Sequence, residues 1–233
     1  MPRLLLALLL ALALPAAAHA DTLTVDPADT NGCTRGTDNV CAKIADAIGQ
    51  AQAGDVITVL KGEYKKSPSL PADLTIKGAP DVRITGATTG DVITVTGSNV
   101  KLEALAIEVP TNGGSAIKVD GAGAVLEGIV ATRQNTSDVN DPVIDVTGSA
   151  TVRKSLIFQN AGATGTAAIR STGTGGTVLE DVIALSFKGP GITFSDSSAN
   201  KLVRSTIVSA EPSSNGVNVT SAGNSTSAKK LVL

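Results

Sequence analysis

Hydrophobic and polar positions alternate in short runs along most of this chain. In one unit of the pattern, Ile93 and Val95 flank a polar residue and are followed by Gly97, and Leu105 and Ile107 repeat the alternation. A period of two places residues of one kind on one face of a β-strand. Because each run is short and closes at a residue suited to a turn, the pattern predicts many short strands.

The same unit returns about every 25 residues, an interval typical of solenoid repeats. Its first apolar column consists of Ile93, Ile117, Ile144, Ile169, Ile192 and Val217. A second column consists of Leu105, Ile129, Leu156, Val182 and Thr206, and the residues two places later are Ile107, Ala131, Phe158, Ala184 and Val208. A repeat with several short strands and no internal helix predicts a β-solenoid, in which equivalent residues of successive rungs stack in ladders.

A ladder of charged residues is expected two positions before the second column. It contains Glu103, Glu127, Lys154, Glu180 and Arg204. Opposite charges on an exposed edge are worth about 0.2 to 1 kcal/mol a pair, so we interpret this ladder as a solvated structural face. Arg153 disturbs the pattern, because Leu126 and Leu179 hold the matching inward position. Either that rung is shifted by one residue, with Val152 inward, or its strand begins later.

The connections between the predicted strands differ in how much their length varies. The spacing from Gly97 and its counterparts to the second column is nearly constant, whereas the connection that follows Ile107 and its counterparts carries the insertions. Insertions are tolerated best in surface loops, so the variable connection is predicted to face outward. Its longest example contains residues 134–142.

The N-terminal segment has the three parts of a secretory signal peptide. Arg3 precedes an apolar run from Leu4 to Leu14, and Ala18, His19 and Ala20 come before Asp21. The apolar run is too short for a membrane-spanning helix. We therefore expect cleavage between Ala20 and Asp21, a mature chain without a membrane span, and a secreted, periplasmic or cell-surface location.

Composition narrows the chemistry of the mature chain. His19 and Met1 are the only histidine and methionine, and both lie in the segment predicted to be removed. Without imidazole, His-ligated metal sites and Ser-His-Asp or Cys-His nucleophiles are excluded. A net charge of −2, without long runs of one sign, gives no indication of binding to nucleic acid.

The only two cysteines, Cys33 and Cys41, lie close together in a chain predicted to be exported. In an oxidising compartment such a pair forms a disulfide, and a structural zinc site would need further cysteine or histidine ligands. We therefore predict a disulfide bond between them.

The part of the chain before the repeat has its own pattern. Strands are expected over residues 21–25 and 55–60, and further short strands over 74–77 and 82–85. The apolar spacing over residues 40–53 predicts one amphipathic helix, with Asp38 or Asn39 as its N-cap and Gly54 at its end. A helix of this kind could seal the open end of a strand stack.

Four segments near the N-terminus carry a family resemblance. They are Cys41–Ile48 (CAKIADAI), Ala53–Val59 (AGDVITV), Gly62–Tyr64 (GEY) and Leu74–Gly78 (LTIKG). The block resembles the N-terminal cap and first rung of the pectin lyase-like right-handed parallel β-helix superfamily. The resemblance implies an all-β, right-handed parallel β-helix with an N-terminal capping α-helix. It implies no single activity, because such folds carry polysaccharide lyases, glycosidases and adhesin-like surface proteins.

The expected organisation is a signal peptide over residues 1–20 and one β-helix domain over 21–233. Within that domain, residues 21–60 hold the cap and first strand, and residues 61–233 hold the rungs. The C-terminal residues 229–233 resemble the second strand of an incomplete rung. An uncapped sheet end invites end-to-end association.

The enzymes of this fold class need specific side chains. Glycosidases need a dense carboxylate cluster, which neighbouring rungs do not offer here. A lyase needs carboxylates to hold Ca²⁺ and an arginine or lysine to remove a proton. The candidates for that role are Arg133, Asp138, Asp141, Asp145 and Lys154. Turn-forming residues share the same loop, which favours a plain polar corner.

The leading hypothesis is an exported, non-catalytic β-helix protein that serves as a structural or a glycan- or protein-binding surface module. The alternative is a polysaccharide lyase acting by calcium-assisted β-elimination on uronate polymers, or a degenerate relative of one. No cofactor is expected, apart from Ca²⁺ under the lyase alternative. The expected partners are a polysaccharide or a cell-surface protein.

Overall fold

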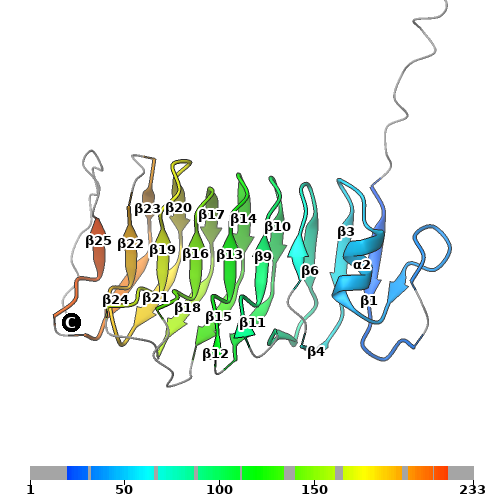
Figure 1. The fold of residues 1–233 in the computed structure, drawn as a ribbon, viewed down its shortest axis with the longest axis horizontal. Helices are drawn as coiled ribbons and strands as arrows, with labels where there is room; N and C mark the ends of the chain where they lie inside the picture. Colours follow the sequence, from blue (N-terminus) through cyan, green and yellow to red (C-terminus); the bar gives the residue numbers. More distant parts are fainter. Residues whose placement is uncertain are drawn as a thin grey trace, which may run out of the picture.

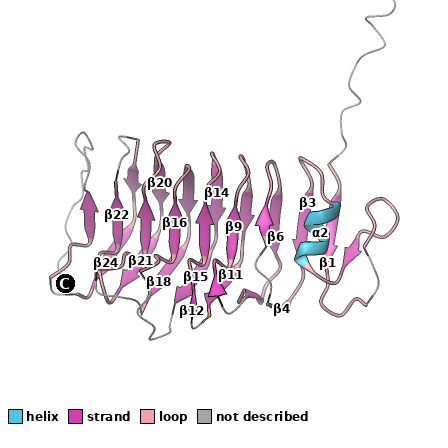
Figure 2. Ribbon diagram, viewed as in Figure 1, coloured by secondary structure: helices cyan, strands magenta, loops and turns pink. Residues whose placement is uncertain are grey.

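Short runs of β-branched and apolar residues form parallel strands that stack into three long sheets, and the chain coils through them as a right-handed parallel β-helix (Figure 1). The computed structural model describes residues 20–30, 33–65, 68–86, 89–110, 112–133, 140–160, 165–195, 199–211 and 213–219. Figure 2 shows that strands dominate these residues, with one short helix at the N-terminal end. The predicted fold class is confirmed.

Each rung contributes one strand to each long sheet. In spatial order, the first sheet contains β2 (Val40–Cys41), β1 (Thr22–Val25), β3 (Val56–Val59), β6 (Thr75–Gly78), β10 (Lys101–Glu103), β14 (Ala124–Glu127), β17 (Ala150–Arg153), β20 (Thr177–Glu180) and β23 (Lys201–Val203). The second sheet contains β4 (Gly62–Tyr64), β7 (Val82–Ile84), β11 (Ala106–Val109), β15 (Val130–Arg133), β18 (Leu156–Gln159), β21 (Ile183–Ser186) and β24 (Thr206–Ser209). The third sheet contains β5 (Ser69–Leu70), β9 (Ile93–Val95), β13 (Ile117–Val119), β16 (Ile144–Val146), β19 (Ile169–Ser171), β22 (Ile192–Phe194) and β25 (Val217–Val219). A short pair, β8 (Thr89–Gly90) with β12 (Asn112–Gly113), lies outside them.

The core runs along the inside of the coil as ladders of apolar side chains. The third sheet aligns Ile93, Ile117, Ile144, Ile169, Ile192 and Val217 in register, as the first predicted column requires. The first sheet supplies Ile57, Ile76, Leu102, Leu126, Val152 and Leu179, all of them buried. A single rung could not bury these residues, so the stacking of rungs is what excludes water from them.

The corner between the first and second sheets is a bend of constant length. One residue in each rung there has a left-handed backbone, and these residues are Ala104, Gly128, Lys154, Asp181 and Arg204. The corner between the second and third sheets varies in length, and it is the outward loop that the insertions predicted. Its longest insertion includes residues 134–139, which lie outside the described residues.

The register of two rungs differs from the prediction. Leu156 pairs with Val130 and faces outward, whereas Ile157 pairs with Ala131 and is buried. Phe158 was also predicted to point into the coil, and the same shift of one residue makes that prediction wrong. In a later rung, Ile207 rather than Val208 aligns with the inward Ala184. In the first of these rungs the turn from β16 to β17 is one residue shorter than the turn from β13 to β14, because Val146 pairs with Val119 and Ala150 with Ala124. In both rungs a serine, Ser155 or Ser205, therefore takes the place before the outward residue.

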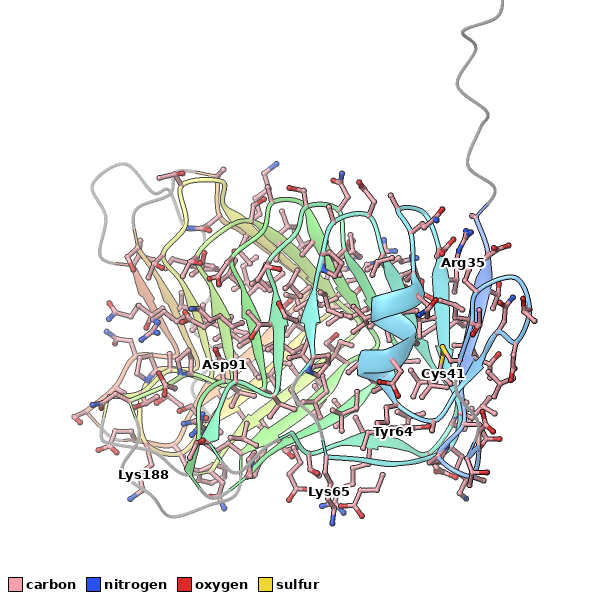
Figure 3. All side chains as sticks on the ribbon, turned by 45° about the vertical axis from the view of Figure 1, so that its right-hand side comes forward. Arg35, Cys41, Tyr64, Lys65, Asp91 and Lys188 are labelled. Atoms are coloured by element: carbon pink, nitrogen blue, oxygen red, sulfur yellow. A yellow bond between two sulfur atoms is a disulfide. The ribbon has the colours of Figure 1, made fainter. Side chains whose placement is uncertain are left out.

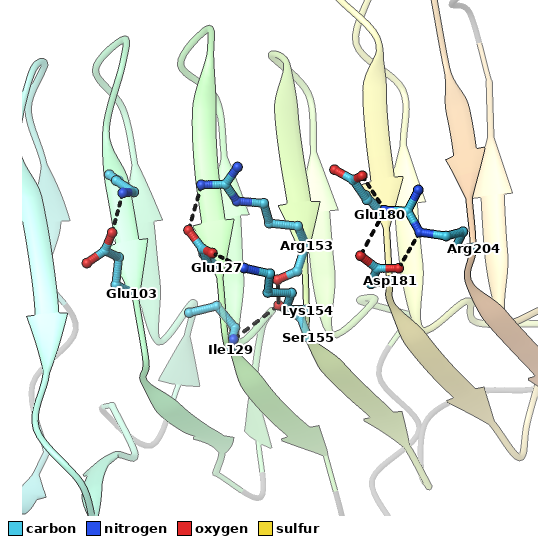
Figure 4. A network of polar contacts seen from close by, with 10 residues as sticks. Glu103, Glu127, Ile129, Arg153, Lys154, Ser155, Glu180, Asp181 and Arg204 are labelled. Atoms are coloured by element: carbon cyan, nitrogen blue, oxygen red, sulfur yellow. Dashed lines mark hydrogen bonds and ion pairs between the residues drawn. The ribbon is translucent and has the colours of Figure 1, made fainter.

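The charged ladder is also shifted in these two rungs. Its members by register are Lys77, Glu103, Glu127, Arg153, Glu180 and Val203. Val152 is therefore the inward residue, and Arg153 faces solvent beside Glu127. Lys154 and Arg204 lie one position later, in the bends, and still reach the ladder (Figure 4). The prediction of an exposed charge ladder is confirmed, and its membership is corrected.

The capping helix α2 (Ile44–Gln50) is shorter than predicted. Residues 40–41 form β2, which pairs with β1, so the helix cannot begin there. The expected capping side chains are used elsewhere, because Asp38 accepts from Val40 and Asn39 accepts from Gly36. Ile44 and Ala47 nevertheless enter the core and pack against β1, β2 and β3, which closes the N-terminal end of the coil.

Candidate functional site

A cleft lies at the variable corner, over the outer face of the third sheet. We call it the corner cleft. It encloses about 330 Å³ and is lined by Asn140, Pro142, Thr166, Arg170, Pro190, Thr193 and Asn218, with Gly165 and Ala167. A volume of this order falls at the lower end of the range for small-molecule sites. The corner loops form one wall, and outward side chains of β19, β22 and β25 form the floor.

Arg170, Thr193 and Asn218 in the floor of the corner cleft belong to a longer ladder of outward residues on the third sheet. In register these are Thr94, Lys118, Asp145, Arg170, Thr193 and Asn218. Asp145 and Arg170 form a two-point ion pair, with Nε donating to Oδ1 at 2.9 Å and Nη2 donating to Oδ2 at 2.7 Å. The hydrogen bond and charge of Asp145 raise the pKa of Arg170, although burial opposes them. The pair therefore fixes the guanidinium at the edge of the cleft.

Arg133 was a sequence candidate for the proton-abstracting base, and its side chain lies inside the coil. It is the last residue of β15 and has no exposed surface. Its Nη1 donates to the Gly113 carbonyl at 3.2 Å, and its Nη2 donates to the Gly114 carbonyl. Burial lowers the pKa of Arg133, and the charges of Asp141 and Asp91 oppose that effect. These contacts with backbone carbonyls indicate that Arg133 has a structural role.

Two serines occupy the same register position as Arg133 in later rungs and make similar bonds. Ser186 Oγ donates to the Thr166 carbonyl at 3.5 Å, and Ser209 Oγ donates to the Gly189 carbonyl at 2.8 Å. In these three rungs the inward polar side chain donates to a carbonyl of the chain that returns toward the third sheet. Unpaired carbonyls there would carry a desolvation cost, so these residues hold the variable corner in place.

Two of the other lyase candidates, Asp145 and Lys154, lie apart from Arg133. Asp145 faces outward on the third sheet, and Lys154 lies at the bend between the first and second sheets, 3.0 Å from Glu127. Asp138 lies outside the described residues. Asp141 is near enough to both Arg133 and Arg170 to act on each electrostatically.

Arg170 was missed as a site residue by reasoning from the sequence. It occupies the same register position as Asp145, one rung later. Opposite charges at equivalent positions of neighbouring rungs were the available signal, and that signal was applied only to the ladder of the first sheet.

The outer face of the second sheet is apolar over several rungs. Val130, Leu156 and Ile183 align across β15, β18 and β21, and each is more than one third exposed. Phe158 packs edge-on against Phe187, with ring centroids 5.6 Å apart. A shallow groove of about 270 Å³ crosses the N-terminal end of this face, beside an ion pair between Arg83 and Glu108.

A buried carboxylate ties the N-terminal segments together. Asp55 has no exposed surface and accepts from Arg35 Nε at 3.0 Å, from Arg35 Nη2 at 3.1 Å and from the backbone amides of Gln52 at 2.8 Å and Asp21 at 2.7 Å. Burial alone would raise the pKa of Asp55, but these hydrogen bonds, Arg35 first, lower it to about 2. We call Asp21, Arg35, Gln52 and Asp55 the N-terminal knot.

The predicted disulfide is present and holds the loop that carries Arg35. Cys33 and Cys41 are bonded, with Cα atoms 4.6 Å apart. Figure 3 shows Arg35 and Cys41 at the N-terminal end of the coil, close to β1 and α2. The predicted cleavage site, Ala20–Asp21, lies at the start of β1 and therefore beside the knot.

Among the described residues, no group of three or more His, Cys, Asp or Glu side chains is placed to hold a metal ion. A calcium site under the lyase alternative therefore stays a prediction. No helix in the described part of the chain is long and apolar enough to cross a membrane.

Comparisons with protein-family models, curated proteins and solved structures found no match to this chain. The structure confirms the parallel β-solenoid, and membership of the pectin lyase-like superfamily stays a prediction from the N-terminal segments.

Proposed function

We propose that this protein is an exported, non-catalytic β-helix that acts as a surface module and binds glycans at the corner cleft. The observation that carries the proposal is the Asp145–Arg170 pair at the edge of a 330 Å³ cleft floored by neutral hydrogen-bonding residues. Small-molecule sites combine a concave shape with a few polar groups that are fixed in advance.

The chemistry of the cleft favours hydroxyl-bearing ligands over strongly charged ones. The ion pair uses Nε and Nη2 of Arg170, so Nη1 is not used by the pair and is left to donate to a ligand oxygen. Thr193 and Asn218, on the next two strands, add groups that both donate and accept. Because the Asp145 carboxylate offsets the Arg170 charge, the pair attracts an anionic sugar only weakly.

The burial of Arg133 supports the non-catalytic part of the proposal. A general base must reach the proton that it removes, and the Arg133 guanidinium is enclosed and bonded to the carbonyls of Gly113 and Gly114. A substrate on the outer face of the third sheet could not contact it without opening the corner.

The alternative is a lyase of uronate polymers or a degenerate relative of one. The observation that favours it is Asp141, whose carboxylate acts electrostatically on two arginines beside the corner cleft. Carboxylates near an arginine are what calcium-assisted elimination requires. Under this alternative, Asp141 and Asp145 would be calcium ligands and Arg170, which is partly exposed, would be the base.

Binding should be tested with the mature protein on a glycan array, followed by calorimetry with the oligosaccharides that bind. We expect Arg170→Ala to weaken binding at least about tenfold, which corresponds to the loss of one charge-assisted hydrogen bond. Arg204→Ala is the matched control, because Arg204 also pairs with carboxylates but lies at the opposite corner. Glycan binding that Arg170→Ala leaves unchanged, or no glycan binding at all, would contradict the proposal.

A second assay separates binding from turnover. The mature protein is incubated with a panel of polyuronates, with and without Ca²⁺, and unsaturated product is followed by absorbance. We expect no product. Calcium-dependent product that disappears in Asp141→Asn would instead establish the lyase alternative.

A further inference from the structure

The N-terminal knot has a feature that bears on processing of the chain. The backbone nitrogen of Asp21 lies 2.7 Å from Oδ1 of Asp55, a carboxylate without exposed surface. Arg35 brings one positive charge to two carboxylates, those of Asp55 and Asp21, and its Nη2 is 3.1 Å from each. The nitrogen that donates to Asp55 is also the nitrogen that the predicted cleavage would release.

We propose that the amino terminus created by cleavage between Ala20 and Asp21 is an ammonium group that binds Asp55 and completes the N-terminal knot. Hydrolysis by an endopeptidase adds water across the Ala20–Asp21 peptide bond. The Ala20 carboxylate leaves with the signal peptide, and the Asp21 nitrogen becomes an amine that takes up a proton near neutral pH. The inference rests on the export part of the proposed function and is independent of glycan binding.

The charges at the knot explain why an ammonium group bound to Asp55 is favoured. Before cleavage, Asp21 donates to Asp55 through a neutral amide, and the two carboxylates face a single guanidinium. After cleavage, a second cation occupies the same position, so the local charges balance. The hydrogen bond from the amide to the Asp55 carboxylate already has one ionised partner, and the ammonium adds a direct attraction between opposite charges. Because Asp55 is buried, solvent screens this pair little.

The position of the knot gives the new bond a structural consequence. Asp55 stands immediately before β3, Asp21 immediately before β1, and these two strands pair along their length. Gln52 binds the same carboxylate from the chain that follows α2, and Arg35 binds it from the disulfide loop. The mature amino terminus would therefore connect, through Asp55, all the segments that close the N-terminal end of the coil.

The stability that the bond between the ammonium and Asp55 adds depends on pH, and the charges around it set the direction. The groups that face the new ammonium are Asp55 from the start of β3, the Asp21 carboxylate and Arg35 from the disulfide loop. The carboxylate contact at 2.7 Å raises the pKa of the amine in the folded state above its value in the unfolded chain, about 7.7 to 8.0. The added stability is thus fully present below about pH 7.7 and is lost as the pH rises through the raised value.

The first test is the identity of the amino terminus. The full-length protein is expressed with export, and the exported form is analysed by intact mass and N-terminal sequencing. We expect Asp21 as the first residue. A mature chain that begins at any other residue would overturn the proposal, whatever the result of the glycan assays.

The second test compares two recombinant proteins released from a fusion partner, one beginning at Asp21 and one retaining Ala20. The second keeps a neutral amide at Asp21 and is the matched control. We expect the protein beginning at Asp21 to have a melting temperature several degrees higher at pH 7, and the difference to close at high pH. Introducing Asp55→Asn into both should remove the difference. Equal melting temperatures at pH 7, or a difference that survives Asp55→Asn, would overturn the proposal.

A third measurement needs no substitution, so it holds even if Asp55→Asn prevents folding. Competitive acetylation reports the fraction of each α-amino group that is unprotonated. At about pH 6.5, well below both pKa values, we expect the amine of Asp21 to react about tenfold more slowly than the amine of the Ala20-extended protein, as a rise of about one unit in pKa requires. Equal rates would mean that the terminus does not bind Asp55.

Discussion

Arg153 lies directly beside Glu127 on neighbouring strands of the first sheet, and its Nη2 is 2.6 Å from the Glu127 Oε2. Lys154 approaches the same carboxylate from the adjacent bend (Figure 4). Hydrogen bonds from Lys154, and then from Arg153, lower the pKa of Glu127. This contact fixes the register of its rung, because an outward Arg153 requires an inward Val152 and an outward Leu156.

The register of this rung predicts opposite outcomes for two adjacent residues. Ile157 is fully buried, so Ile157→Ala should lower the free energy of unfolding by about 2 to 5 kcal/mol. Phe158 faces outward against Phe187, so Phe158→Ala should cost only about 0.5 to 1.5 kcal/mol. Urea denaturation followed by circular dichroism measures both values. A larger cost for Phe158→Ala than for Ile157→Ala would show that the rung is in the other register.

The glycines that follow the third sheet stack directly on one another. A Cβ on Gly148 would lie 2.0 Å from the Gly121 carbonyl oxygen, which backbone atoms cannot avoid cheaply. We expect Gly148→Ala to destabilise the protein by at least about 1 to 3 kcal/mol. Gly49→Ala is the control, because a Cβ on Gly49 in α2 meets nothing within 4 Å and should stabilise the protein by about 0.4 to 1 kcal/mol. Thermal unfolding of the two variants should shift in opposite directions.

Acid should release the N-terminal knot. Because the pKa of Asp55 is lowered to about 2 in the folded protein, its contribution to stability is present above about pH 4 and is lost as the pH falls toward 2. The size of the shift corresponds to about 2 kcal/mol. The free energy of unfolding, measured by urea titration from pH 5 to pH 2, should fall more steeply for the unmodified protein than for Asp55→Asn. Parallel curves would mean that Asp55 is not held as described.

Removal of the disulfide should weaken the same end of the coil. The bond between Cys33 and Cys41 closes a short loop, and the chain-entropy model gives about 2 to 3 kcal/mol for it. We expect the double variant Cys33→Ala, Cys41→Ala to unfold at lower urea concentration. The loss should also reduce the effect of Asp55→Asn, because the loop that carries Arg35 is then less restrained. Fully additive effects would indicate that the loop and the knot act independently.

Arg133 should matter for stability rather than for chemistry. Arg133→Ala leaves the Gly113 and Gly114 carbonyls without their donor and should cost about 1 to 3 kcal/mol. Arg153→Ala is the matched control, since Arg153 ends β17 as Arg133 ends β15 but faces solvent, and its loss should cost no more than about 1 kcal/mol. Chemical denaturation of the two variants measures the difference. Similar values would mean that the buried contacts of Arg133 contribute little.

The amino-acid sequence is enough to specify the coil. The column that begins at Ile93 returns at Ile117 and Ile144, and an alternating pattern with this period can be satisfied only if rungs stack and share one core. It also determined the disulfide and the outward position of the variable corner. These are local or periodic properties, and the physical preferences of individual residues are enough to specify them.

The register of single rungs and the residues that meet at each site depend on contacts between rungs. Alternation allows a slip of one residue wherever a small residue such as Ser155 can occupy either face, and contacts with both neighbouring rungs remove that freedom. The two ion pairs of interest, Arg170 with Asp145 and Arg35 with Asp55, join residues that are distant in the chain. Side-chain chemistry shows which charges are available, but which of them meet is determined by how the coil stacks and closes.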